Sequence, residues 1–299
     1  MQIATPLVPV ALPAWPLTVW CKLEYLNPSG STKDRIARYI LEKAIRRGEL
    51  AAGGSVVEAS SGSTSIALAL SCARLQLDFT AVMPEGVSEE RIKIIRAYGA
   101  EVELTSRDAG IEGAIARARE ISQQQEAFWP RQFSNPDNTN AHRHQTASEI
   151  LAQSPSLCID FFVSGVGTGG TLVGVTCGLQ DAGCHVTPVL ARPVETDRAI
   201  DVECCSFSRR IPGVVEGLST IFQSADLPGL EEVDVPDREA LAVTRQLIRA
   251  GFPVGPSSGL NYLAAVRTLE RHGKNGVAVT VFPDRMERYF STELFRGME

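Results

Sequence analysis

Residues 159–180 read IDFFVSGVGTGGTLVGVTCGLQ, and this stretch decides the fold class. Its first part, Ile159–Ser164, is a short apolar run that predicts a buried strand, and Thr171–Gln180 predicts a helix. The glycines between them let the backbone approach a ligand closely, and the N-terminus of a helix favours anions. The stretch therefore predicts a strand, an anion-binding loop and a helix, which together form a building unit of α/β proteins.

The same alternation of strands and helices extends over nearly the whole chain. Further strands are expected at Leu17–Leu23, Val56–Ala59, Phe79–Met83, Glu101–Thr105, His185–Ala191 and Val277–Phe282. Further helices are expected at Lys33–Arg47, Thr64–Leu75, Ser88–Tyr98, Ala109–Gln125, Ala141–Gln153, Arg238–Ala250 and Leu260–His272. Such alternation favours largely parallel sheets, which bind their ligands beyond the carboxyl ends of the strands. The loops after the strands are therefore the places to look for chemistry.

Length and composition limit the class of protein. The chain has 299 residues, 44% of them apolar and 21% charged, with a formal net charge of −6. At about 150 residues per domain, this length fits one large or two ordinary domains. The acidic balance argues against broad nucleic-acid binding, which needs a basic face. The four prolines of the apolar N-terminal stretch oppose a signal-peptide helix, and no other uncharged run approaches the ~20 residues of a membrane span. We therefore expect a cytoplasmic protein.

The seven cysteines do not form a recognisable framework. Their number is odd, no CxxC occurs, and no pair stands at zinc-site spacing from the four histidines. We expect a reduced protein that uses cysteines as small apolar residues, with no metal site. The adjacent Cys204 and Cys205 leave a vicinal disulfide open as an alternative.

Two more loops resemble binding sites. The first, at residues 27–35, reads NPSGSTKDR and places Lys33 in the first turn of a helix. The positive end of the helix dipole lowers the pKa of an amine there, which suits a nucleophilic lysine, although a solvated lysine paired with Asp34 is the simpler interpretation. The second, Ser60–Ser65, offers hydroxyl and N–H groups at a helix start and suits a carboxylate or phosphate.

A nicotinamide-binding protein is an alternative, because Gly165, Gly167 and Gly170 satisfy the GxGxxG pattern. That pattern requires an acidic residue at the end of the next strand, but the strand there ends in Arg192. Such an interpretation also leaves the other two loops unexplained. A reactive lysine, a carboxylate receptor and a phosphate loop, with GPSSG at 255–259 before another helix, instead suggest pyridoxal phosphate as cofactor.

With these loops, the chain resembles the cysteine synthase and cystathionine β-synthase family of fold-type-II pyridoxal-phosphate enzymes. The resemblance covers nearly the whole chain, through TPLV, NPSGSTKDR, SSGST, VMPEGVSEERIKIIRAYGAEVELT, QFSNPDN, VSGVGTGGT, VGPSSG and FPDRMERYFSTELF. It implies a tryptophan synthase β-like α/β fold of two three-layer αβα domains with the cofactor in the cleft between them. The larger, cofactor-binding domain would comprise residues 1–37 and 143–299. The smaller, mobile substrate-binding domain would comprise 38–142, and the enzyme would be a homodimer.

The resemblance also implies roles for individual residues. Lys33 would form the Schiff base, and Ser257 would bond the pyridine nitrogen. The phosphate loop would comprise Gly167, Thr168, Gly169, Gly170 and Thr171. The substrate carboxylate would bind at Ser60, Ser61, Gly62, Thr64 and Gln132.

Two departures from the family pattern bear on the substrate. Ser63 stands where the family has an asparagine that reaches the 3′-oxygen of the cofactor, and a serine is shorter. The segment from Arg192 to Gly217 is rewritten and contains Arg209 and Arg210. We expect Gly217 to contact substrate and the arginine pair to be solvated, with an anion site for a larger substrate as the alternative.

The implied reaction is β-replacement on an O-activated L-serine, such as O-acetylserine, by a sulfur nucleophile. Lys33 would remove the α-proton, and loss of the β-substituent would give an aminoacrylate that takes up the nucleophile. A cysteine desulfhydrase that releases sulfide is the second hypothesis. A catalytically weak relative kept for binding a partner is the third.

Overall fold

The computed structural model describes residues 4–154, 158–195, 219–222 and 227–296. Its larger sheet has six strands in the order β1-β2-β9-β6-β7-β8. These strands are β1 (Leu7–Leu12), β2 (Trp15–Lys22), β6 (Phe161–Ser164), β7 (Thr187–Val194), β8 (Glu231–Pro236) and β9 (Ala278–Val281). All neighbours pair in parallel except β1 and β2. The expectation of largely parallel sheets is confirmed.

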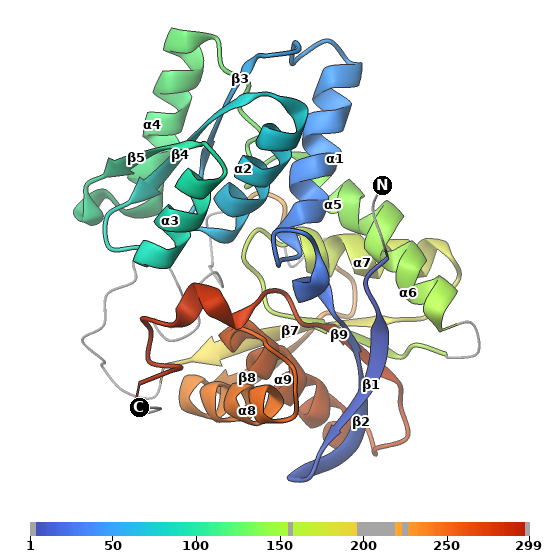
Figure 1. The fold of residues 1–299 in the computed structure, drawn as a ribbon. Coiled ribbons are helices and arrows are strands. Elements are labelled where there is room, and N and C mark those ends of the chain that lie inside the picture. The colour runs from blue at the N-terminus through green and yellow to red at the C-terminus, as the bar shows by residue number, and fades with distance from the viewer. Residues whose placement is uncertain (1–3, 155–157, 196–218, 223–226, 297–299) are drawn as a thin grey trace.

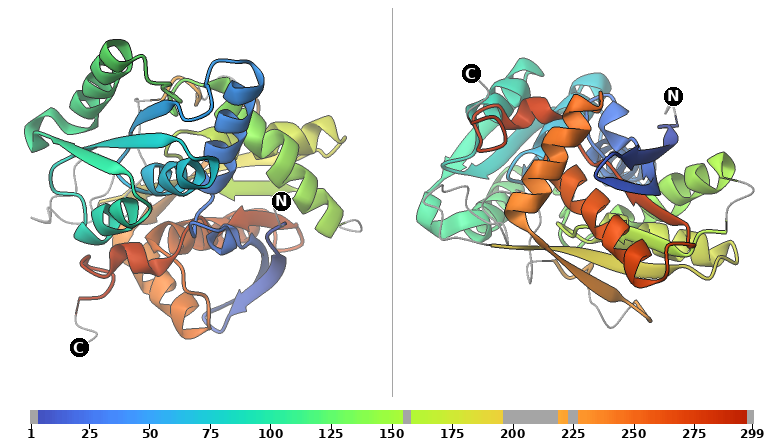
Figure 2. Two further views of the ribbon diagram at one scale, coloured as in Figure 1. Left: turned by 45° about the horizontal axis from the view of Figure 1, so that its top comes forward. Right: turned by 90° about the horizontal axis from the view of Figure 1, so that it is seen from below.

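The smaller sheet contains β3 (Ser55–Ala59), β4 (Asp78–Pro84) and β5 (Glu101–Thr105), all parallel. The helices in this part of the chain, in sequence order, are α1 (Lys33–Arg46), α2 (Ser63–Leu75), α3 (Glu89–Ala97) and α4 (Gly110–Gln125). Figure 1 shows this sheet and its helices stacked above the six-stranded sheet, and Figure 2 shows the same stacking from two further directions.

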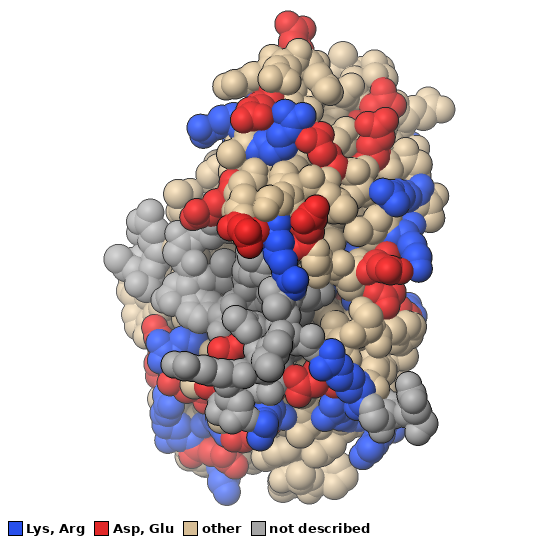
Figure 3. Space-filling view, turned by 90° about the vertical axis from the view of Figure 1, so that its left-hand side faces the viewer, with Lys and Arg blue, Asp and Glu red and all other residues tan. Residues whose placement is uncertain are grey.

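Most of the remaining helices belong with the larger sheet. The remaining helices are α5 (Pro136–Ala141), a π-helical turn at His142–Thr146, α6 (Ala147–Gln153), α7 (Gly170–Asp181), α8 (Asp237–Arg249) and α9 (Pro256–Arg271). Of these, α5 packs against both α1 and α7. Among the described residues, no helix combines the length and apolar character needed to cross a membrane. On the face shown in Figure 3, acidic and basic side chains are interspersed over the described surface.

Each sheet is covered by helices on both faces, because successive strand residues point to opposite sides. In β6, Phe162 packs into the cluster that contains α7, whereas Val163 packs into the cluster that contains α9. In β3, Val56 packs with α2, whereas Val57 packs with α4. Both sheets are therefore the middle layers of αβα sandwiches, as expected for the fold class.

Two strands and one helix differ from the sequence prediction. Strand β1 lies in the proline-rich N-terminal stretch, where Pro9 is tolerated because β1 is an edge strand and pairs only with β2. Strand β8 is the other edge, and its acidic EEVDVP sequence lacks the apolar character of an internal strand. The helix expected at 141–153 is present, but its first part differs, because a π-helical turn at His142–Thr146 separates α5 from α6.

The cysteines that the structure describes differ in their surroundings, and Cys158 is exposed. Cys21, Cys72, Cys158, Cys177 and Cys184 are unpaired. Cys21 and Cys72 lie in the two cores, and burial raises the pKa of the Cys72 thiol to about 12. Neither thiol is therefore suited to act as a thiolate. Cys204 and Cys205 lie outside the described residues, as do Arg209, Arg210 and Gly217.

Candidate active site

One cleft collects the loops singled out in the sequence. It lies where β3, β6 and β9 end and where α1, α2, α7 and α9 begin. Most of the predicted site residues line it, namely Lys33, Ser60, Ser61, Ser63, Thr64, Gln132, Gly167, Thr168, Gly169, Thr171 and Ser257. Gly62 and Gly170 do not line the cleft, although they belong to the loops that do.

Lys33 is the first residue of α1 and projects into the cleft. Removal from water lowers the pKa of its amine, and the Asp284 carboxylate opposes this shift. The expected alternative, an ion pair with Asp34, is not present. Asp34 instead accepts hydrogen bonds from the Ser29 N–H at 3.0 Å and from the Ser29 hydroxyl. Within the described structure Lys33 Nζ has no hydrogen-bond partner, which leaves the amine available for chemistry.

The glycine loop is held in a shape that side chains would prevent. Gly169 has a φ of +87°, and a Cβ there would collide with Phe222. Its neighbour Thr168 accepts a hydrogen bond from Asn138 Nδ2 at 2.9 Å. Ser219 donates to the Thr168 carbonyl at 2.6 Å and thereby fixes the loop from the other side. The first N–H groups of α7 face this loop and have no acceptor within the helix, so the loop can receive an anion.

The serine loop is fixed by its own side chains. Ser60 Oγ accepts from the Gly62 N–H at 3.0 Å, and Thr64 donates to Gln132 Oε1 at 2.6 Å. Gln132 Nε2 donates in turn to the Ala59 carbonyl at 2.7 Å. One proton of the Gln132 amide group remains for a ligand. The loop is therefore rigid and lined with donors, which suits a carboxylate.

A buried carboxylate lies behind this loop. Glu58 accepts hydrogen bonds from Trp129 Nε1 at 3.0 Å and from the Gln132 N–H at 3.0 Å. Burial raises its pKa to about 7, and these donors oppose the shift. Glu58 thus anchors the backbone of Gln132, whose side-chain amide lines the cleft.

A second buried carboxylate faces the cleft itself. Asp284 Oδ2 accepts from the Tyr289 hydroxyl at 2.7 Å and from Ser63 Oγ at 3.2 Å. Oδ1 is buried without a hydrogen-bond partner among the described residues. Ser63 therefore bonds to a carboxylate in the position where the family has an asparagine. Asp284 was not predicted as a site residue, although its segment, FPDRMERYFSTELF, contributed to the resemblance.

Two further side chains of the cleft were also not anticipated. Arg91 from α3 donates to the Ser61 carbonyl at 3.2 Å and lies over the Tyr289 ring, 5.2 Å from its centroid. Asn261 accepts from the Gly165 N–H at 2.8 Å and donates to the Val281 carbonyl at 2.9 Å. The contact of Arg91 with Tyr289 links the part that carries the smaller sheet to the segment after β9, and Asn261 links the ends of β6 and β9. No sequence periodicity reports contacts between residues so far apart.

Known proteins resemble this chain over nearly its full length. A family model described as pyridoxal-phosphate dependent enzyme matches residues 2–284. A cysteine synthase of Staphylococcus aureus is 37% identical over 285 residues, which cover 93% of this chain and 89% of that protein. A hydrogen sulfide-producing enzyme of Fusobacterium nucleatum has a TM-score of 0.89 at 33% identity, covering 100% of this chain and 90% of that one. An O-acetylserine dependent cystathionine beta-synthase of Helicobacter pylori has a TM-score of 0.86 at 31% identity, covering 99% and 100%.

Proposed function

Because the chain belongs to the family of pyridoxal-phosphate-dependent enzymes, we propose that it catalyses β-replacement on an O-activated L-serine. The donor is O-acetylserine or a similar compound, and a sulfur nucleophile gives L-cysteine or a related β-substituted alanine. One observation carries the proposal: an unpaired lysine amine, a glycine loop for a phosphate and a donor-rich serine loop line the same cleft.

The residues present fit the cofactor. The cleft offers Lys33 for the aldehyde, and Gly167, Gly169 and Thr171 for the phosphate at the N-terminus of α7. Ser257 at the start of α9 offers a neutral hydroxyl for the pyridine nitrogen. When bound, pyridoxal phosphate withdraws electrons from the α-carbon of an amino acid, so that its β-substituent leaves readily.

Lys33 accepts the α-proton in this proposal. A lysine with a lowered pKa carries an unprotonated amine at neutral pH more often than an ordinary lysine does, so more of the enzyme is ready to accept the proton. After the transfer the ammonium group lies in a cleft shielded from water, where a positive charge is costly without a partner. Asp284 supplies the compensating negative charge, since its carboxylate lines the same cleft and raises the pKa of the Lys33 amine.

The serine loop binds the carboxylate of the substrate. The hydroxyl and N–H groups of Ser60, Ser61 and Thr64 lie at the positive end of the α2 dipole, and Gln132 adds an amide proton. We propose in addition that Gly217, which lies outside the described residues, contacts the substrate.

A cysteine desulfhydrase is the second candidate function. The likeness to a hydrogen sulfide-producing enzyme favours it. Incubation with cysteine alone separates the two candidates. Sulfide released without an added acceptor supports the desulfhydrase, whereas cysteine made from O-acetylserine and sulfide supports the synthase.

The decisive test is a spectral titration of the holoenzyme with O-acetylserine, O-phosphoserine, serine and cysteine. We expect O-acetylserine to shift the visible absorption band, and added sulfide to restore the original band while cysteine accumulates. If none of the four compounds changes the spectrum, the proposal is wrong and a weakly catalytic relative kept for binding a partner is favoured.

We propose a cytoplasmic homodimer in which residues 38–142 close as a smaller domain over the substrate, while residues 1–37 and 143–299 carry the cofactor. The separate apolar cores of the two sheets support this division. Light scattering of the purified protein tests the dimer.

A further inference from the structure

The phosphate loop is supported by a helix face that lacks side chains. Gly170, Gly174 and Gly178 are spaced four apart along α7 and so lie on one side of it. A Cβ at Gly170 would collide with Asn138 Oδ1, and one at Gly174 would lie 2.8 Å from His142 Cβ. This glycine face lets α5 and the π-helical turn approach α7 unusually closely.

The close approach brings one side chain to each of the two loop threonines. Asn138 Nδ2 lies 2.9 Å from Thr168 Oγ1 and also donates to the Gln132 carbonyl at 2.8 Å. His142 Nε2 lies 3.2 Å from Thr171 Oγ1. Both threonines line the cleft, whereas Asn138 and His142 are buried behind it.

The direction of the hydrogen bond from Asn138 follows from its chemistry. An amide nitrogen can only donate, so Thr168 Oγ1 accepts. Within the described residues the Thr168 hydroxyl has no acceptor for its own proton. That proton is therefore available to a ligand in the cleft.

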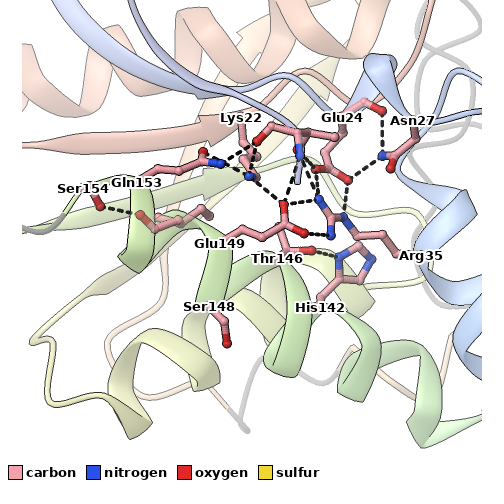
Figure 4. A network of polar contacts seen from close by, with 12 residues as sticks. Lys22, Glu24, Asn27, Arg35, His142, Thr146, Ser148, Glu149, Gln153 and Ser154 are labelled. Atoms are coloured by element: carbon pink, nitrogen blue, oxygen red, sulfur yellow. Dashed lines mark hydrogen bonds and ion pairs between the residues drawn. The ribbon is translucent and has the colours of Figure 1, made fainter. Parts of the chain in front are cut away.

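His142 stands between two hydroxyls. Its Nδ1 lies 2.9 Å from Thr146 Oγ1, and its Nε2 faces Thr171. Burial lowers the pKa of His142 to about 3, and the neighbouring Glu24 carboxylate opposes this only in part, so the ring is neutral. Figure 4 shows the ring beside Thr146 and close to Arg35. A neutral imidazole has one donor and one acceptor, so its tautomer decides which way Thr171 points.

We propose that Asn138 and His142 are positioning residues that direct the hydroxyl protons of Thr168 and Thr171 toward the phosphate of the cofactor. His142 then carries its proton on Nε2 and donates to Thr171, while Nδ1 accepts from Thr146. An anionic phosphate accepts hydrogen bonds and cannot donate when fully ionised, so it selects this tautomer. The inference rests on the proposed function only in taking pyridoxal phosphate as the ligand.

The tautomer can be observed directly in the wild-type holoenzyme. The chain has four histidines, so selective ¹⁵N-histidine labelling gives few signals to assign. We expect the buried His142 to show a protonated Nε2 and an unprotonated Nδ1 across the neutral range. The opposite tautomer overturns the proposal for His142, whatever reaction the enzyme catalyses.

Variants measure the effect on the cofactor. His142→Met keeps the length of the side chain but removes its hydrogen bonds, whereas His142→Gln keeps a donor near the position of Nε2. We expect His142→Met to weaken binding of pyridoxal phosphate to the apoprotein about tenfold, the scale of one charge-assisted hydrogen bond. His142→Gln should restore most of the loss.

Pyridoxal, which has no phosphate, is the matched control ligand. Its affinity should change less than about twofold in either variant, because the lost interaction acts only on the phosphate. An equal loss for both ligands would show that His142 has a merely structural role. The His142→Met change should also add little to Thr171→Val, since both remove the same hydrogen bond; full additivity contradicts the proposal. Failure of β-replacement would leave all of these binding results unaffected.

Discussion

Lys33 and Arg35 lie two residues apart on the first turn of α1, yet their surroundings are opposite. Lys33 faces the cleft, has no hydrogen-bond partner at Nζ among the residues that the structure describes, and has a lowered pKa because it is withdrawn from water. Arg35 points to the other side, where it is fully buried and bonds two carboxylates, Glu24 and Glu149, at 2.6 and 2.7 Å. Burial alone would lower the pKa of Arg35, but the Glu24 carboxylate raises it.

Two side chains of the same helical turn therefore serve different purposes: Lys33 lines the cleft, and Arg35 stabilises the fold. The buried ion network, which we define as Lys22, Glu24, Arg35 and Glu149, joins β2, α1 and α6. Figure 4 shows these four side chains close together. Thr5 from the N-terminal segment donates to Glu24 at 2.6 Å. Because this network fixes α1, Lys33 can remain unpaired without the helix shifting.

Removal of the Lys33 amine should have the largest effect. In Lys33→Ala the proposed base and cofactor link are both lost, so β-replacement should fall by at least about 10³-fold, and the visible band of the bound cofactor should shift. Lys43→Ala is the control, since Lys43 lies on the same helix and pairs with Asp137 outside the cleft. A Lys33→Ala protein that keeps both band and turnover would contradict the assignment.

Breaking the buried ion network should affect stability instead. Glu24→Gln leaves the buried Arg35 with one carboxylate, and breaking such a pair costs about 3–5 kcal/mol of unfolding free energy. Urea denaturation measures the loss. The exposed Arg38–Glu42 pair on the same helix is the control, because Glu42→Gln should cost less than about 1 kcal/mol. Equal losses in the two variants would mean that burial does not distinguish the pairs.

The same network predicts a characteristic acid sensitivity. Burial would raise the pKa of Glu24, but Arg35 lowers it to about 2, against an ordinary value of 4.5. A carboxyl whose pKa is lowered on folding stabilises the protein above its ordinary pKa, and this contribution disappears as the pH falls from 4.5 through 2. Unfolding free energy measured over this range should fall less steeply for Glu24→Gln than for the wild type.

The sequence predicted most of the cleft because the relevant loops carry local signals. Glycines, hydroxyl residues and a lysine at helix starts can be recognised within each loop by itself. The residues of the glycine and serine loops do meet in one cleft. The edge strands β1 and β8 were missed because an edge strand does not need an apolar sequence on both faces.

Contacts between distant segments could not be predicted in this way. Asp284, Tyr289 and Arg91 meet across more than 190 residues of sequence, and His142 reaches Thr171 only because a π-helical turn and the glycines of α7 allow it. The periodicity of apolar residues along a helix does not reveal a π-helical turn, because the one residue that such a turn inserts only shifts the apolar pattern by one position.

Asp284→Asn tests the compensating charge opposite Lys33 at nearly constant shape. Without the carboxylate the pKa of Lys33 should fall further, because Asp284 is the group that raises it. The protonated lysine then becomes harder to form, and we expect the rate of β-replacement to fall about tenfold. Glu287→Gln is the control, since Glu287 pairs with Arg285 at 2.5 Å and does not line the cleft. Unchanged rates in Asp284→Asn would remove Asp284 from the mechanism.

The smallest expected effect concerns Ser63, which differs from the family asparagine. Ser63→Ala removes one of two hydrogen bonds to Asp284 Oδ2 and leaves the one from Tyr289, so the rate should fall only about two- to fivefold. If Ser63 acts through Asp284, the same change should have no effect in an Asp284→Asn background. If it acts on the cofactor directly, the two losses multiply and the visible band shifts in Ser63→Ala alone. Steady-state rates and spectra of the four proteins therefore decide whether Ser63 contacts the cofactor, as expected for the family asparagine, or acts through the Asp284 carboxylate.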